Sequence, residues 1–435
     1  MGNTMFKGLR VVEVTVYVTG PLTSQALADC GAETIQIQTG SRRPAMAAGG
    51  RPGAAGGPGG APGGAGGPPG RAGAGGAPGG GAVAEAGGPP AGMGGGLAEG
   101  FTQNSTNKMS ISLNFANPKG LELTYKLLAK TDVFIENLAG HTLINRHLGY
   151  EDVKKVNPSI IYLSTCMMGQ TGPYATHAAS GHKLSALSGF NNMNGCPDRE
   201  AGWVGTYTDF VAPRYNIMAV LAALEYRRRT GKGQFLDMSQ YEGGVQFMGP
   251  AILDYNINKR IAGRHGNDNP YAAPHNAYKC RGEDRWCAIA AFSDDEWRNV
   301  CRVMDMQSLA DDSMFDTLVH RKENEVYLDA MINSWTATRP AEEVMALMQA
   351  GGVSAGVVET VEDQIEYDAH LKSRHTFWEI EPADARNDMK YPDYRLSLRI
   401  RQGPALGADN DYVYKKVLGM SDAEIADLTK QGVIG

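Results

Sequence analysis

The first forty residues alternate between strand-like and helix-like patterns, and they constrain the fold more than any other part of the sequence. Residues 9–14 form a short apolar run that is typical of a buried strand. Gly20 and Pro21 turn the chain, and a helical pattern follows as far as Cys30. A second strand is predicted over residues 33–38. A strand, a helix and a strand in this order predict a doubly wound, Rossmann-like α/β sheet.

The length of the chain predicts more than one domain. A chain of 435 residues exceeds the size at which one hydrophobic core usually stops growing. We expect residues 1–215 to begin a large domain, residues 216–340 to form a linker helix and a smaller α+β domain, and residues 341–435 to return to the large domain. Residues 44–100 are almost entirely Gly, Ala and Pro and have few side chains to bury. This glycine-rich segment is interpreted as a flexible loop, or alternatively as a packed lid or partner-contact arm.

Charge, hydropathy and cysteine content exclude several classes of function. The net charge of −6 argues against nucleic acid as the main partner. No apolar run reaches membrane-spanning length, and the N-terminus has no signal-peptide core, so we expect no membrane partner and a cytoplasmic location. The six cysteines are scattered without a CxxC pair, which predicts free thiols and no metal site.

A candidate ligand loop follows an apolar strand in the middle of the chain. Residues 160–163 (IIYL) are predicted to form a buried strand. Residues 169–174 (GQTGPY) then form a turn rich in glycine and proline. In open α/β sheets, ligands bind at loops that leave the carboxyl ends of strands. We therefore expect this turn to border the functional site.

Several segments together resemble the class III coenzyme A (CoA) transferases, a family that also includes the α-methylacyl-CoA racemases. The segments are GLRVVEV, NKMSISLN, DVFIEN, GQTGPY, RRRTGKGQFLDMSQYE and the C-terminal tail from PALGADNDY onwards. They agree with the family in order and spacing, and the resemblance covers nearly the whole chain outside the Gly/Ala/Pro segment. It implies a large Rossmann-like domain, a smaller domain and an interlocked dimer in which each chain threads through the other.

The resemblance also implies a substrate and the residues that contact it. A CoA thioester is the expected substrate, with no permanently bound cofactor. Lys108 and Asn137 match family positions near CoA, and Gln170 lies in the GQTGPY turn. Arg146 stands one residue beyond the position of a family arginine, which is about 100° around a helix. These four residues are the predicted CoA contacts.

The sequence departs from the family at the catalytic position that the resemblance implies. CoA transfer requires a carboxylate that attacks the thioester carbonyl, gives a mixed anhydride and releases a CoA thiolate. In the family this is expected to be an aspartate shortly after GPY, but no Asp or Glu occurs between Ser159 and Asn194. The position falls on Gly181, or on Lys183 in the racemase alignment. No catalytic residue is therefore predicted. The later acidic residues are interpreted as structural: Asp198, Asp209, Asp237 and Glu242.

The resulting prediction is a non-catalytic (pseudoenzyme) subunit of a heteromeric class III CoA-transferase, paired with a homologous sister chain that carries the aspartate. The resemblance, to two-chain members of the family in which one chain lacks the aspartate, further implies succinyl-CoA as the donor and benzylsuccinate, an acid of anaerobic aromatic degradation, as the candidate acceptor. One alternative is a homodimeric transferase or racemase with a displaced catalytic residue, for which His182, Lys183 and Cys166 are candidates. The other alternative is a scaffold protein without enzymatic activity.

Overall fold

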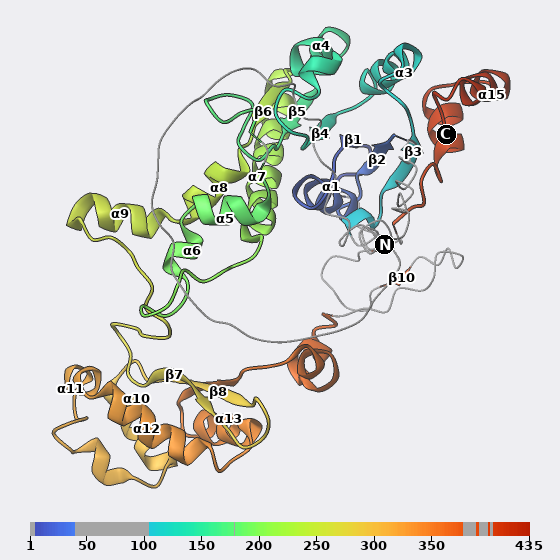
Figure 1. The fold of residues 1–435 in the computed structure, drawn as a ribbon. Coiled ribbons are helices and arrows are strands. Elements are labelled where there is room, and N and C mark those ends of the chain that lie inside the picture. The colour runs from blue at the N-terminus through green and yellow to red at the C-terminus, as the bar shows by residue number, and fades with distance from the viewer. Residues whose placement is uncertain (1–4, 40–103, 178, 377–388, 391–398, 401–402) are drawn as a thin grey trace, which may run out of the picture. The chain divides into compact units, whose positions relative to one another are not determined.

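The structure is a computed structural model that describes residues 5–39, 104–177, 179–376 and 403–435, together with the backbone of residues 389–390 and 399–400 (Figure 1). The Gly/Ala/Pro segment predicted over residues 44–100 lies outside the described residues. The chain divides into two compact units. Unit 1 comprises Met1–Ala178, Asn216–Met238 and Arg386–Gly435, and unit 2 comprises Ala179–Tyr215 and Ser239–Ala385.

Unit 1 is built on a six-stranded parallel sheet with the strand order β3-β2-β1-β4-β5-β6. The strands are β1 (Arg10–Val14), β2 (Glu33–Gln38), β3 (Met109–Ser112), β4 (Val133–Glu136), β5 (Ile161–Ser164) and β6 (Gln234–Asp237). The chain runs outward from β1 to β3 on one side and from β4 to β6 on the other. The strand order therefore reverses between β1 and β4, and the predicted doubly wound sheet is confirmed.

Both faces of this sheet are covered, as its continuous apolar strands require. One hydrophobic cluster joins β-strand residues to α3 (Pro118–Leu128), α4 (Tyr150–Val156) and η5 (Tyr412–Val417). The second joins the opposite face to α1 (Thr19–Asp29) and to the C-terminal half of α7 (Tyr207–Thr230). Val11 and Val12 illustrate the division, because neighbouring strand residues point to opposite faces and these two lie in different clusters.

The remaining elements of unit 1 are short. They are η2 (Ile144–Arg146), β10 (Met389–Lys390), β11 (Arg399–Ile400) and α15 (Asp422–Lys430). The two-residue strands β10 and β11 pair with each other in antiparallel fashion. Ser421 and Glu424 form a complete capping box at the start of α15, which fixes where this last helix begins.

Unit 2 contains a three-stranded antiparallel sheet, β7 (His275–Lys279), β8 (Trp286–Ala290) and β9 (Ser354–Val357). Its helices are α5 (Gly181–Leu187), α6 (Phe190–Met193), α8 (Gln240–Phe247), α9 (Gly249–Asn258), α10 (Asp294–Val303), η3 (Gln307–Ala310), α11 (Leu318–Glu323), α12 (Glu325–Thr336), α13 (Ala341–Ala350), η4 (Asp363–Tyr367) and α14 (Ala369–Ser373). A separate core packs α10, α12 and α13 against one face of the sheet.

The unit boundaries fall at residues 178, 215, 238 and 385. One of them coincides with the expected boundary at 215, but residues 216–238 belong to unit 1, and no boundary falls at the expected position 340. Helix α13 and strand β9 follow residue 340, yet β9 pairs with β8 and Val344 and Met348 belong to the core of unit 2. Propensity along the chain does not show this pairing, because it joins strands more than sixty residues apart. The interlocked dimer stays a prediction.

Candidate functional site

The strand reversal in unit 1 is bridged by Asn137, which directly follows β4. Its Oδ1 accepts a hydrogen bond from Val16 N at 2.7 Å, and its Nδ2 donates to Val16 O at 2.7 Å. Gly20, in the first turn of α1, lies so close that a Cβ there would be 2.8 Å from the Asn137 side chain. Asn137 therefore fixes the loop after β1 against the loop after β4 at the crevice where such folds bind ligands. The predicted CoA contact of Asn137 stays a prediction.

Gln170 anchors the GQTGPY turn to three neighbouring segments. Its backbone N–H donates to Asp237 Oδ1 at 2.9 Å, and its side-chain Nε2 donates to Glu136 Oε1 at 3.1 Å and to Ser164 Oγ at 2.8 Å. Its Oε1 accepts from His141 N at 2.9 Å. The amide of Gln170 is thus bonded inside unit 1, and the turn is held to the ends of β4, β5 and β6. A CoA contact through this side chain would require these bonds to rearrange.

The tip of the same turn is exposed although its base is fixed. Residues 171–174 are all exposed, with Tyr174 at 56%. Gly169 and Gly172 have φ values of 83° and 85°, a conformation that favours glycine. The turn therefore presents backbone N–H groups and a tyrosine at the carboxyl edge of the sheet. Backbone donors of this kind can stabilise an oxyanion that forms on a thioester carbonyl.

Glu136 is a buried carboxyl group beneath this turn. It is 2% exposed and accepts hydrogen bonds from Ser164, from Gln170 and from Leu138 N at 3.0 Å. Burial raises the pKa of Glu136 to about 7, and these three hydrogen bonds partly offset that increase. The carboxyl therefore changes charge near neutral pH while it supports the turn.

Lys108 is buried, in contrast to its predicted position near a CoA phosphate. Its ammonium group lies 2.9 Å from Glu13 Oε1 and 2.9 Å from Pro21 O, and its side chain is fully inaccessible to solvent. Burial lowers the pKa of Lys108, and the Glu13 carboxylate partly restores it. Its role in this structure is to hold β3 to β1 and α1. A phosphate contact would require the buried ion pair to open.

Arg146 remains available as an anion-binding residue. It lies in η2, is exposed, and extends its guanidinium over the Phe115 ring at 5.9 Å from the ring centroid. Among the residues that the structure describes, no carboxylate pairs with it. An unpaired, always-charged guanidinium suits a phosphate, and the predicted CoA contact stays a prediction for Arg146.

Position 181 has no side chain and no room for one. A Cβ on Gly181 would lie 2.4 Å from Asp209 Oδ2 and 2.7 Å from Thr206 Cβ. The carboxylate of Asp209, which also accepts a hydrogen bond from Gln240, therefore occupies the space that a residue at 181 would fill. The sequence predicted the missing carboxylate at 181. It did not predict that a second carboxylate takes its place, because Asp209 is distant along the chain.

The other residues considered as replacements for the missing catalytic aspartate differ in their exposure to solvent. Lys183 is exposed, and so is His182, whose ring packs at a tilt against the Trp203 ring. Cys166 is 2% exposed, and burial raises the pKa of its thiol to about 12, so it is an inert thiol at neutral pH. Asp237 accepts the Gln170 N–H and has the structural role that was predicted for it.

Two of the later acidic residues, Glu242 and Asp198, are exposed and have no side-chain partner among the described residues, so the structure does not support the structural role predicted for their carboxylates. Asp198 lies in a loop whose base is closed by Gly202 N, which donates to Asn194 O at 2.7 Å. Residues 196–201 are exposed, and the Asp198 carboxylate has no hydrogen-bond or ion-pair partner among the described residues. A fixed loop thus presents a free carboxylate. Gly195 and Gly202 bracket this loop in the sequence, and from them a constrained loop around Asp198 could have been predicted.

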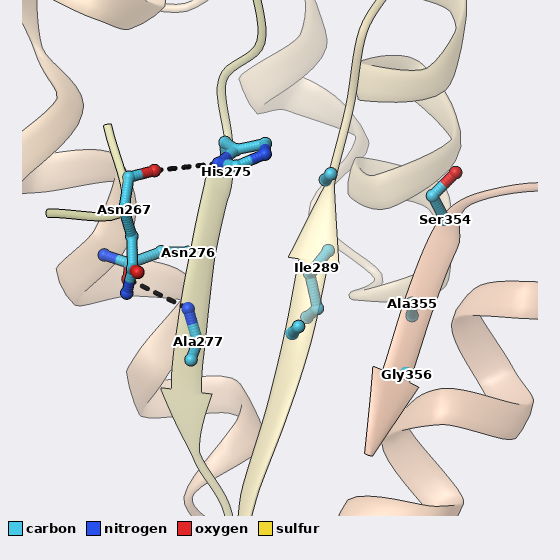
Figure 2. A pocket seen from close by; sticks show the side chains of 10 residues that line it. Asn267, His275, Asn276, Ala277, Ile289, Ser354, Ala355 and Gly356 are labelled. Atoms are coloured by element: carbon cyan, nitrogen blue, oxygen red, sulfur yellow. Dashed lines mark hydrogen bonds between the residues drawn. The ribbon is translucent and has the colours of Figure 1, made fainter. Parts of the chain in front are cut away.

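A further hollow lies on the exposed face of the unit 2 sheet (Figure 2). It has a volume of about 400 Å³ and is lined largely by small residues of β7, β8 and β9, with His275 and Asn267 at one side. His275 Nδ1 is 2.8 Å from Asn267 O. Among the described residues that line the hollow there is no carboxylate or thiol, so it lacks the carboxylate that CoA transfer requires.

Comparison with known proteins decides the family. The model of CoA-transferase family III matches residues 6–52 and 84–410, and the gap between them falls within the Gly/Ala/Pro segment. This chain belongs to CoA-transferase family III. No described helix is both long and apolar enough to cross a membrane.

Several relatives of this family III chain are named as CoA-transferases. Succinyl-CoA–D-citramalate CoA-transferase of Chloroflexus aurantiacus is 29% identical over 98% of this chain and 97% of its own length. The β subunit of succinyl-CoA–L-malate CoA-transferase from the same organism is 28% identical over 76% of this chain and 83% of its own length. A CaiB/BaiF family protein from Brucella suis has a similar structure, with a TM-score of 0.74 at 26% identity over 95% of this chain and all of that one.

Proposed function

We propose that this chain is one chain of a CoA-transferase that moves CoA from succinyl-CoA to a carboxylic acid, with benzylsuccinate as the candidate acceptor. Family membership supports transfer of CoA between an acyl-CoA and an acid. Several relatives carry succinyl-CoA in their names, which supports the donor. The exposed GQTGPY tip and the free guanidinium of Arg146 could hold the thioester and a phosphate of CoA.

The proposed non-catalytic role of this chain rests on the space next to Gly181, which neighbouring side chains occupy. A side chain at 181 would have its Cβ 2.4 Å from Asp209 Oδ2 and 2.7 Å from Thr206 Cβ, so a carboxylate there would require both neighbours to shift. In the proposed arrangement this chain is non-catalytic, and a homologous sister chain supplies the carboxylate that attacks the thioester. Relatives named as α and β subunits of one succinyl-CoA–L-malate CoA-transferase support a two-chain enzyme.

One observation favours a second candidate, a chain that catalyses transfer with a displaced carboxylate. A nucleophile must be reachable and have a free oxygen. Asp209 is half-buried and bonded to Gln240, whereas Asp198 is exposed and unbonded among the described residues. In this case Asp198 attacks the thioester carbonyl, the C–S bond breaks, CoA leaves as its thiolate, and a mixed anhydride with Asp198 remains.

A CoA-transfer assay separates the two. The full chain is assayed with succinyl-CoA and a range of acids, first alone and then co-expressed with a homologous sister chain. Activity only in the complex, unchanged by Asp198→Asn, supports the non-catalytic role. Activity of the single chain that falls more than about 1,000-fold in Asp198→Asn, but not in the neighbouring control Glu200→Gln, supports the second candidate. Absence of transfer in both preparations would refute CoA transfer by this chain.

A further inference from the structure

Trp203 is unusually exposed for a tryptophan. Its side chain is 70% exposed, and its ring packs at a tilt against the His182 ring, with the centroids 4.7 Å apart and the planes at 35°. An indole presents a large apolar surface, and leaving it in water forgoes a substantial hydrophobic stabilisation. The exposed indole, packed against His182, therefore offers a flat apolar surface to a ligand.

The position of Trp203 is fixed from both sides. The preceding residue, Gly202, lies against Asn194, and a Cβ on Gly202 would be 2.6 Å from Asn194 O. Two residues later Gly205 adopts φ of 68°, which favours glycine. His182 in turn is fixed by its neighbour Gly181, which is buried at the start of α5. The Trp203–His182 ring pair is thus built on three constrained glycines.

An arginine without a counter-ion lies beside the same loop. The Arg264 side chain packs against Gly195, at 3.6 Å from where a Cβ would lie, and Gly202 N is 3.5 Å from that same point. Arg264 donates to Asn192 O at 3.4 Å, but its Nε is buried without a partner, and no described carboxylate pairs with it. A guanidinium with free donors is suited to a carboxylate.

We propose that Arg264 and Trp203 form the subsite for the acceptor, which is a carboxylic acid that also carries a flat apolar ring. Arg264 binds a carboxylate of the acid, and the Trp203–His182 ring pair binds its ring. Arg264 packs against Gly195 and Trp203 directly follows Gly202, so both border the base of the loop that carries Asp198. This inference rests on the proposed function. Adenine, the flat ring of the donor, is separated from the thioester by the long pantetheine arm, which favours the acceptor as occupant.

Binding titrations on the full chain test the subsite independently of transfer. Benzylsuccinate is the probe with a ring, and succinate is the probe without one. We expect benzylsuccinate to bind more tightly than succinate. Trp203→Ala should weaken benzylsuccinate binding by about 3- to 10-fold and leave succinate unchanged, while Trp203→Phe should retain most of the affinity. Arg264→Gln should weaken both acids by at least about 10-fold.

The controls distinguish the subsite from a general effect on the fold. Tyr271 is another exposed aromatic residue of unit 2, at 76%, and Tyr271→Ala should change neither affinity. Equal binding of the two acids to the wild type, or equal loss for both in Trp203→Ala, would overturn the ring subsite. A higher Kd for CoA in Trp203→Ala, with benzylsuccinate unaffected, would place adenine there instead. Ring-selective acid binding without any CoA transfer would leave the subsite standing and refute the proposed function.

Discussion

At the scale of single residues, the space next to Gly181 determines which side chains fit at position 181. An aspartate at this position would place its Cβ 2.4 Å from the Asp209 carboxylate, which combines a steric clash with like-charge repulsion. We predict that Gly181→Asp lowers the free energy of unfolding by about 2–4 kcal/mol. Urea denaturation followed by circular dichroism measures this loss.

Two further variants check the cause of that loss. In Gly181→Asp combined with Asp209→Ala, the contact with the Asp209 carboxylate is removed and only the contact with Thr206 Cβ remains, so about half of the stability should return. Gly249, at the start of α9, has no heavy atom within 4 Å of the point where a Cβ would lie and serves as the control. Gly249→Asp should cost less than about 0.5 kcal/mol. Equal losses at Gly181 and Gly249 would show that Asp209 does not fill the space.

Glu136 should make the stability of unit 1 depend on pH near neutrality. Its pKa is raised by burial from 4.5 to about 7, so the folded chain holds a proton that the unfolded chain releases between these values. Its contribution is therefore greatest below pH 4.5 and is lost as the pH rises through 7, by a total on the order of 3 kcal/mol. We predict that Glu136→Gln flattens this pH dependence between about pH 5 and 8, in urea titrations at each pH. A parallel pH dependence in wild type and variant would contradict the raised pKa.

At the scale of elements, Gln170 shows how one side chain fixes a loop to a sheet. Its amide bonds Glu136, Ser164 and the backbone of His141, so its removal leaves buried polar groups without partners. We predict that Gln170→Ala destabilises unit 1 by about 1–3 kcal/mol and increases hydrogen exchange of the GQTGPY turn. Thr171→Ala, an exposed neighbour, should leave the exchange unchanged. Slow exchange of the turn in Gln170→Ala would show that the backbone alone holds it.

Local patterns predicted the elements of unit 1 but not the contacts between them. The apolar runs before Gly20 and after Asp132 are visible in the sequence because strand periodicity is local. The family resemblance predicted Lys108 as a CoA contact, but its partner Glu13 is 95 residues away and its burial depends on the folded sheet, so local patterns did not show its ion pair. The contact of Asp209 with Gly181 and the packing of Trp203 against His182 were equally beyond local patterns. Distant pairs of this kind determine the candidate site.

At the scale of the whole molecule, the two units have separate cores. Leu127 of α3 is fully buried in the core of unit 1, and Ile332 of α12 is fully buried in the core of unit 2. Each core contains side chains from its own unit only. A cavity made in one core should therefore act first on the hydrogen bonds of that unit.

We predict that Ile332→Ala and Leu127→Ala each remove about 2–4 kcal/mol, since both leave a cavity in a packed core. Native-state hydrogen exchange with peptide resolution is the measurement. Ile332→Ala should accelerate exchange in β7, β8 and β9 by at least about 30-fold more than in β1 and β4, and Leu127→Ala should do the reverse. Each variant is the control for the other, because both remove a similar apolar volume. If hydrogen exchange accelerated uniformly across both units in either variant, the two cores would unfold together. Substrate binding to one unit would then stabilise both units against unfolding.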